Sequence, residues 1–211
     1  LKRIFDANSI YQGVMTFTAP EAVYLIQQGF DDLLMGYPIW DENYIKSICA
    51  ELKKGKTIVL MLDAIEHVEH LERIGKAEDC TIPVCLDIDM SSDYPGIHFG
   101  VWRSSIFGKK DALKVAEKIQ DCPHVKLDGI MGYEAQIAGL GDEMPGKMLM
   151  NQVVKLLKKS SIKEIAKRRE GIVEAITEMG FDLRFVNGGG TGSMESTRQE
   201  KGVTEITVGS G

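Results

Sequence analysis

The chain has 211 residues, of which 44% are hydrophobic and 27% charged, a composition typical of one globular domain with a substantial core. Its formal net charge of −6 argues against a nucleic-acid partner, because the longest basic run lies in a segment, 156–170, that we expect to be a solvated helix. No apolar stretch reaches the roughly 20 residues that cross a bilayer, and no charged-then-apolar leader opens the sequence. We therefore expect a cytoplasmic protein with a small ligand and no membrane partner.

Short β-rich runs recur along the chain, and helical patterns separate them. The runs occupy residues 11–17, 31–38, 57–62, 83–89 and 125–133, and two closing segments, 183–193 and 204–211, each begin with an apolar strand that runs into glycine. The helical patterns occupy residues 19–29, 41–55, 64–76, 109–121 and 148–179, and a helix tail at 1–10 opens the chain. This alternation predicts parallel strands with covering helices, an α/β fold.

The strand count points to a barrel. Segment 57–62 is a nearly continuous apolar run, as expected for a strand buried on both faces in a barrel or a doubly wound sheet. A (β/α)8 TIM barrel has eight strands, whereas seven are visible and none precedes the helix tail. We expect that residues 1–211 form strands two to eight of such a barrel, the first strand being absent. A complete open seven-stranded sheet is the alternative.

The ends of the two closing strands are rich in glycine and hydroxyl groups. Glycine lets an anion approach the main chain closely, so consecutive turns of this kind direct several backbone N–H groups at one phosphate. The loops after the seventh and eighth strands of a barrel frequently form such a site. The pair of turns therefore predicts a phosphorylated ligand. The alternative is that these glycines only make tight turns.

Acidic residues follow the strand at 83–89. Asp87 and Asp89 are two apart on a strand and therefore point to the same side, near the expected mouth of the barrel. Two carboxylates there need a cation, and Arg103 is the candidate. The alternatives are that Arg103 is a surface ion-pair partner, or that Asp87, Asp89 and Asp93 bind Mg²⁺.

Further candidates follow other strand ends. Tyr133 and Gln136 lie after the strand at 125–133, where active-site residues of barrels originate, although Tyr133 could equally be a buried filler. His98 lies in the loop leading to Arg103. Trp40 and Trp102 either wall a pocket or simply pack.

The remaining histidines and the cysteines suggest no metal site. His67 and His70 are three apart on a helix, but the glutamates around them predict a solvated face, and His124 is expected to be structural. The four cysteines lack metal-type spacing, so we expect reduced thiols: Cys49, Cys80, Cys85 and Cys122.

Taken in order, these segments resemble the alanine racemase N-terminal domain superfamily, the fold-type III pyridoxal-phosphate enzymes, and especially its D-threonine aldolase and D-serine dehydratase branch. The resemblance is carried by GVMTFTAPEA, by DIDM with the arginine of VWRSS, by LDGIMGYEAQ, by VNGGGTGS and by EITVGSG. Each motif is weak alone, but their order at successive strand ends is specific. It covers nearly the whole chain.

The resemblance implies roles for individual residues. The two halves of the cofactor's phosphate site would be Gly189, Gly190, Thr191 and Gly192, and Gly209, Ser210 and Gly211. Arg103 would lie near the ring hydroxyl, and Asp87 stands where racemases carry a modified, negatively charged lysine. Tyr133 takes the place of a racemase histidine behind the ring. Thr207 departs from the racemase pattern, which has an arginine facing the pyridine nitrogen, and the ring's electronic state is therefore left open.

The family's cofactor-binding lysine lies at the end of the first barrel strand, and neither Lys2 nor a later lysine occupies a matching place. The resemblance also implies a C-terminal β-domain, which we expect beyond residue 211. In the aldolase and dehydratase branch that domain carries ligands for a divalent metal. Family members usually form homodimers.

The resemblance favours a pyridoxal 5′-phosphate-dependent aldolase, dehydratase or racemase that acts on a small amino acid of D configuration. One alternative is a non-catalytic pyridoxal-phosphate carrier. Another is a phosphosugar-processing barrel that uses the same phosphate site, with Asp87 and Asp89 as acid and base.

Overall fold

The computed structural model describes residues 1–141 and 145–209. Seven strands form one sheet in the order β1-β2-β3-β4-β7-β8-β9. Neighbouring strands pair in parallel at both ends of this order. The strands are β1 (Val14–Thr16), β2 (Leu33–Met35), β3 (Ile58–Leu62), β4 (Ile82–Asp89), β7 (Val125–Tyr133), β8 (Phe185–Gly188) and β9 (Glu205–Ile206). The predicted α/β fold with its seven strands is confirmed.

The chain divides into two compact units. Unit 1 comprises Leu1–Cys85 and Lys118–Leu127, and unit 2 comprises Leu86–Glu117 and Asp128–Gly211. Strands β4 and β7 begin in unit 1 and end in unit 2. The residues predicted to bind the cofactor or to act in catalysis belong to unit 2, whereas Trp40, a candidate for the pocket wall, belongs to unit 1.

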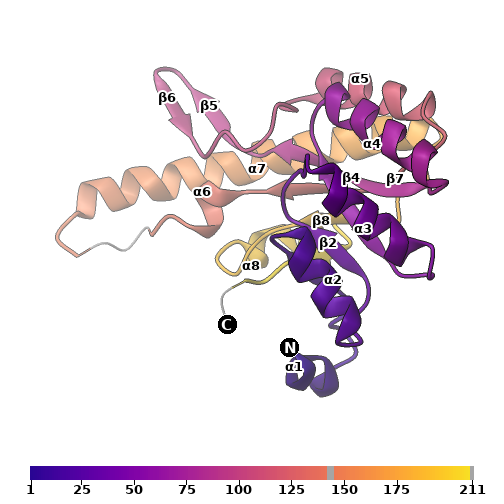
Figure 1. The fold of residues 1–211 in the computed structure, drawn as a ribbon. Helices are drawn as coiled ribbons and strands as arrows, with labels where there is room; N and C mark the ends of the chain where they lie inside the picture. The colour runs from indigo at the N-terminus through magenta and orange to yellow at the C-terminus, as the bar shows by residue number, and fades with distance from the viewer. Residues whose placement is uncertain (142–144, 210–211) are drawn as a thin grey trace. The chain divides into compact units, whose positions relative to one another are not determined.

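Unit 1 repeats strand and helix in the expected order (Figure 1). Its helices are α1 (Lys2–Ala7), α2 (Ala19–Gln27), α3 (Glu42–Leu52) and α4 (Ile65–Glu78). The carboxylate of Asp41 caps α3 by accepting the N–H groups of Asn43 at 2.9 Å and Tyr44 at 3.1 Å. All five residues of β3 are buried, as its continuous apolar sequence predicts.

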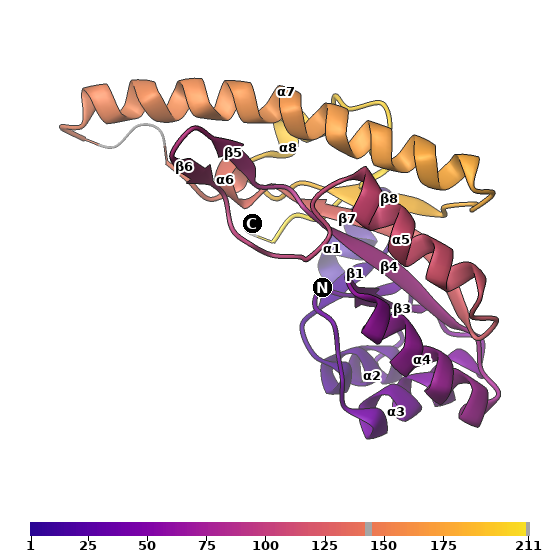
Figure 2. The ribbon, with the colours of Figure 1, turned by 90° about the horizontal axis from the view of Figure 1, so that it is seen from above.

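In unit 2, the helices are α6 (Ala135–Ala138), α7 (Met148–Glu178) and α8 (Met194–Thr197), while α5 (Lys109–Gln120) begins there and ends in unit 1. The antiparallel hairpin of β5 (Ser92–Tyr94) and β6 (Ile97–Phe99) was not expected from the sequence, nor was α6. The hairpin lies beside the N-terminal half of α7 (Figure 1, Figure 2), and the Tyr94 hydroxyl donates to the Leu157 carbonyl at 3.2 Å.

The expectation that segment 156–170 is a solvated helix is confirmed for most of its residues but is wrong for one face. Ser161, Ile165 and Arg169 are buried on one face of α7. The error arose because the many lysines of this segment mask a buried stripe that recurs every three to four residues. Of the helices in the described part of the chain, none combines the length and the apolarity needed to span a membrane.

His70, His124 and the four cysteines have structural roles in unit 1. The ring of His70 stacks on Trp40 with 4.1 Å between centroids, and Nδ1 of His124 lies 2.8 Å from a carboxylate oxygen of Glu72. The expected reduced thiols are confirmed, since all four cysteines are free and buried.

Two helical glycines provide a test of the packing. A Cβ on Gly75 in α4 would lie 2.8 Å from the Cys80 carbonyl oxygen, whereas a Cβ on Gly171 in α7 would meet nothing within 4 Å. Gly75→Ala should therefore lower the free energy of unfolding by about 1–3 kcal/mol. Gly171→Ala should raise it by about 0.5–1 kcal/mol. Urea unfolding measures both. Equal effects of the two substitutions would contradict the close approach at Gly75.

The reactivity of the thiols tests whether the cysteines are buried in the native protein. Burial raises the pKa of Cys49 to about 12, and burial also raises the pKa values of Cys80 and Cys122. Because the thiolate is the reactive form, a disulfide reagent at neutral pH should modify these thiols only when the chain unfolds. Fast labelling of the native protein would show that they are accessible.

Candidate functional site

The two glycine-rich turns begin side by side. Strand β8 pairs in parallel with β9, and Gly188 is the register partner of Ile206. Gly189 has a left-handed backbone, with φ of +77°, and a Cβ there would lie 3.2 Å from Cγ2 of Ile206. Glycine is therefore needed where the first turn passes the second strand. Gly209 is exposed, and the predictions for Ser210 and Gly211 lie outside the described residues.

The first turn is held by its own hydrogen bonds. The Ser193 hydroxyl accepts the N–H of Gly190 at 2.9 Å, and the Gly190 carbonyl accepts the N–H groups of Ser193 and Met194 at 3.1 and 3.0 Å. A Cβ on Gly192 would collide with the carbonyl oxygen of Ala138. These contacts give Gly190 and Gly192 a role in the turn itself, beside the predicted role in anion binding.

Asp87 and Arg103 form a buried pair. Nε of Arg103 lies 3.0 Å from Oδ2 and 3.2 Å from Oδ1 of Asp87, and the side chains are 11% and 3% exposed. The neighbouring carboxylate of Asp89 accepts the backbone N–H of Arg103 at 2.8 Å. The expected pairing with the Arg103 cation is confirmed for Asp87, whereas Asp89 binds the backbone N–H of Arg103; because the pair is buried, the alternative of a surface ion pair is wrong. The two carboxylates fix both the backbone and the guanidinium of Arg103.

The Tyr133 ring lies near both Arg103 and the first glycine turn. The guanidinium carbon of Arg103 is 5.9 Å from the centroid of the Tyr133 ring. A Cβ on Gly190 would lie 3.0 Å from Cε2 of the same ring. Residues that follow β4, β7 and β8 are thus brought together at the carboxyl ends of their strands, which is where barrels place ligand sites.

Thr207 is held from the neighbouring strand. Nδ2 of Asn187, a residue that is 1% exposed, donates to Oγ1 of Thr207 at 2.8 Å and to Oε1 of Glu205 at 2.5 Å. Sequence reasoning missed Asn187, although a polar residue inside an otherwise apolar strand is itself a signal of a specific partner.

Other candidates have different roles. Gln136 donates to the carbonyl of Met90 at 2.5 Å and to the Ser161 hydroxyl at 3.0 Å, so it ties α6 to its surroundings. His98 pairs with Asp93 at 2.8 Å in the hairpin and stacks on Trp102 with 3.9 Å between centroids. Within the part of the chain that the structure describes, no group of three or more His, Cys, Asp or Glu side chains is arranged to hold a metal ion.

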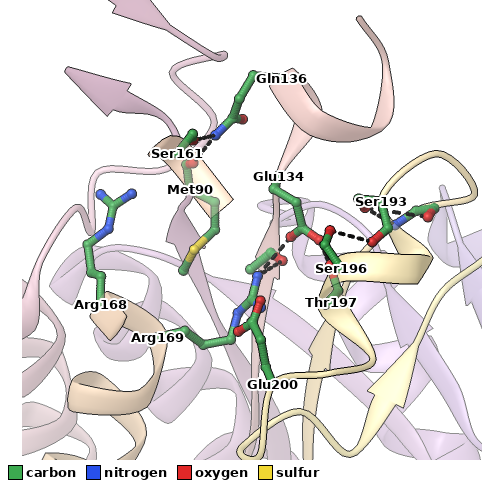
Figure 3. A network of polar contacts seen from close by, with 12 residues as sticks. Met90, Glu134, Gln136, Ser161, Arg168, Arg169, Ser193, Ser196, Thr197 and Glu200 are labelled. Atoms are coloured by element: carbon green, nitrogen blue, oxygen red, sulfur yellow. Dashed lines mark hydrogen bonds and ion pairs between the residues drawn. The ribbon is translucent and has the colours of Figure 1, made fainter. Parts of the chain in front are cut away.

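Sequence reasoning also missed a buried network around Arg169 of α7 (Figure 3). This arginine is 1% exposed. Its Nη2 donates to Glu134 at 2.8 Å and to the Gly132 carbonyl at 3.1 Å, and its Nη1 donates to Glu200 at 2.6 Å. The Thr197 hydroxyl donates to the second oxygen of the Glu134 carboxylate.

Two glycines make room for this guanidinium. Gly132 and Gly188 are register partners on β7 and β8. A Cβ on either would lie 3.2–3.3 Å from guanidine atoms of Arg169. The sequence did carry one signal of this arrangement, because Arg169 falls on the stripe of buried residues Ile165, Ile172 and Ile176.

Two carboxylates share the single charge of Arg169. Burial raises the pKa of Glu200, and the nearby charge of Glu134 acts in the same direction, whereas Arg169 acts to lower it. The net result is a Glu200 pKa above its ordinary value.

Comparison with protein families gives a match across almost the whole chain. The model described as "Alanine racemase, N-terminal domain" matches residues 3–209. Among curated proteins, the 3-hydroxy-D-aspartate aldolase of Paracoccus denitrificans (strain Pd 1222) is 20% identical over 181 residues, which are 86% of this chain and 41% of that protein.

Solved structures with the same fold include an aldolase and a dehydratase that are named for D-amino acid substrates. D-threonine aldolase from Filomicrobium marinum has a TM-score of 0.74 at 17% identity, covering 93% of this chain and 47% of its own. D-threo-3-hydroxyaspartate dehydratase from Delftia sp. HT23 has a TM-score of 0.67 at 17% identity, covering 93% and 46%. The chain thus spans less than half the length of these relatives. At such identities, the likeness to solved structures shows the fold, which is that of the predicted barrel domain.

The network around Arg169 makes a prediction for stability. Arg169→Met leaves two buried carboxylates without their cation and should lower the free energy of unfolding by about 3–5 kcal/mol. Arg198→Met removes an arginine that is 59% exposed and should change it by less than about 0.5 kcal/mol. The double variant Arg169→Met with Glu200→Gln should recover part of the loss, because one buried charge is then gone. Urea unfolding distinguishes these outcomes, and equal stability of the two arginine variants would contradict the network.

The raised pKa of Glu200 also predicts a pH dependence. The native state keeps the Glu200 proton above the ordinary value of 4.5, where the unfolded chain has lost it. The unfolding free energy of the wild-type protein should therefore fall relative to that of Glu200→Gln as the pH rises from about 4 to about 7. Urea unfolding of both proteins across this range measures the difference. An unfolding free energy of the wild type that stays constant or rises relative to that of Glu200→Gln would contradict the raised pKa.

Proposed function

Because the chain belongs to the alanine racemase N-terminal domain family, we propose that it is the cofactor-binding barrel of a pyridoxal 5′-phosphate-dependent enzyme acting on a small amino acid. Within this class we propose aldol cleavage or dehydration of a β-hydroxy amino acid of D configuration. The observation that carries the proposal is the juxtaposition of Arg103, held by Asp87, with Tyr133 and the glycine turn at Gly190.

The residues present fit such a cofactor. The turn 189–192 and the start of the second turn at Gly209 would hold its phosphate, since both follow adjacent strand ends. Arg103 would contact the ring hydroxyl, and Tyr133 would support the face of the ring. When bound, pyridoxal phosphate supplies an electron sink for charge that develops at the substrate Cα.

The residues around Arg103 keep its charge in a fixed orientation. Both carboxylate oxygens of Asp87 lie near Nε of Arg103, at 3.0 and 3.2 Å, so the orientation of the guanidinium is fixed before a ligand binds. An aspartate in this place supplies a permanent negative charge without a modified side chain. Arg103 is therefore a positioned hydrogen-bond donor and need not reorganise when a ligand binds.

Thr207 supports an aldolase or dehydratase over a racemase. In the resemblance, racemases place an arginine at this point, which presents a fixed positive charge to the ring nitrogen. The Thr207 hydroxyl oxygen accepts from Asn187 at 2.8 Å, which leaves its O–H to donate to a further acceptor. A neutral donor in place of a cation changes how strongly the ring withdraws electrons, and the similarity to aldolases and a dehydratase agrees with this difference.

The proposal is tested on the natural protein that contains this chain, purified with pyridoxal 5′-phosphate. We expect an absorbance band at the edge of the visible range that borohydride abolishes. We also expect turnover of D-threonine or D-threo-3-hydroxyaspartate but not of the L enantiomers. Glycine with an aldehyde identifies aldol cleavage, and a 2-oxo acid with ammonia identifies dehydration. Absence of the band, or binding of a sugar phosphate that pyridoxal phosphate does not displace, would reject the proposal.

Arg103→Lys provides the matched variant. Lysine keeps the charge but lacks the planar fork, so kcat/KM should fall by about tenfold or more. Arg73→Met, which removes an arginine that is 57% exposed in unit 1, should leave kcat/KM unchanged. Equal loss in both variants would show that the effect does not come from the site.

A further inference from the structure

We propose that Arg169 is a positioning residue for the ligand site: its guanidinium locks the end of β7 to α8 and thereby holds the glycine turn 189–192 against Tyr133. The inference rests on the proposed function, because the turn is the predicted phosphate site. We assign Arg169 a positioning role because its side chain is 1% exposed and three of its N–H groups donate to protein oxygens.

The position of Arg169 is costly and therefore needs a reason. Its side chain is 1% exposed, and burying a guanidinium carries a desolvation penalty that ion pairing does not generally exceed. Well-packed apolar residues in place of the whole network, Arg169 together with Glu134 and Glu200, would be at least as stabilising. What the guanidinium adds is directional: it fixes several groups of different loops in one geometry.

The first group is the end of β7. Nη2 of Arg169 donates to the Gly132 carbonyl at 3.1 Å and to the Glu134 carboxylate at 2.8 Å. These are the residues on either side of Tyr133. One nitrogen atom therefore binds the backbone of the residue before the tyrosine and the side chain of the residue after it, which restricts the direction in which the Tyr133 ring leaves the strand.

The second group is α8. The carboxylate of Glu134 also accepts the Thr197 hydroxyl, and Nη1 of Arg169 donates to Glu200 at 2.6 Å, just after the helix (Figure 3). The end of α8 is therefore attached to the same guanidinium as the end of β7. Glu134 is the shared link, because its two oxygens bind one partner from each side.

The third step runs from α8 to the glycine turn. The Ser196 hydroxyl donates to the carbonyl of Ser193 at 2.9 Å, and the Ser193 hydroxyl accepts the N–H of Gly190 at 2.9 Å. A displacement of α8 would therefore move the turn, and with it the amides that are predicted to face the phosphate. Gly190 also packs against the Tyr133 ring, so the two arms of the network meet there.

The prediction is that loss of Arg169 weakens binding of the phosphate more than binding of the ring. Two probes separate these effects: pyridoxine 5′-phosphate and pyridoxine. Neither has an aldehyde, so neither reacts with surface lysines. Equilibrium dialysis of the natural protein that contains this chain gives the dissociation constant of each probe. The informative quantity is their ratio, which a general loss of folded protein does not change.

For the wild-type chain we expect tighter binding of pyridoxine 5′-phosphate than of pyridoxine. Arg169→Met should reduce this preference by about tenfold, and Arg169→Lys should restore part of it. Thr197→Val, which removes only the hydroxyl that binds Glu134, should reduce it less but in the same direction, and it serves if Arg169→Met does not fold. Arg198→Met, an exposed arginine adjacent to α8, should leave it unchanged.

The outcomes are distinguishable. If the wild-type chain shows no preference for the phosphorylated probe, the proposed function fails and this inference fails with it. If the wild-type chain shows the preference and the Arg169 and Thr197 variants retain it, the proposed function stands and the positioning role of Arg169 is overturned.

Discussion

The structure depends on the parallel register of β7, β8 and β9. Gly132 is opposite Gly188, and Gly188 is opposite Ile206, so three strands end at neighbouring points. Parallel strands place their carboxyl ends on one edge of the sheet, and the loops that follow neighbouring strands therefore lie close together. The glycines at these ends matter because a side chain at Gly132 or Gly188 would crowd the Arg169 guanidinium, and one at Gly189 would crowd the side chain of Ile206.

Two buried charged groups organise the candidate site. Asp87 orients Arg103, whose guanidinium lies near the Tyr133 ring. Arg169 binds the residues on either side of Tyr133 in the sequence. In both cases a charged side chain of one element fixes the position of a residue that is distant in sequence. Charge pairs in a low-dielectric interior are costly to form and costly to break, so they give a single geometry rather than a large gain in stability.

Sequence reasoning predicted the elements of this fold better than the contacts between their side chains. The alternation of apolar runs and helical patterns located all seven strands and the long helix that ends near Met179. It missed the hairpin β5–β6, whose sequence, SDYPGIHF, is too short and too polar to show a strand period. It also interpreted the helix containing Arg169 as solvated, since charged residues are seldom fully buried.

The sequence by itself determined which residues follow the strand ends, and hence that Asp87, Arg103, Tyr133 and the glycines from Gly189 belong to one rim. It determined this because period and turn chemistry are local properties that a single chain displays directly. Only the tertiary structure decided that Glu134 and Glu200 converge on Arg169, because the partner of a buried charge is set by how helices and loops pack, over separations of 31 and 35 residues here. No local pattern encodes that choice.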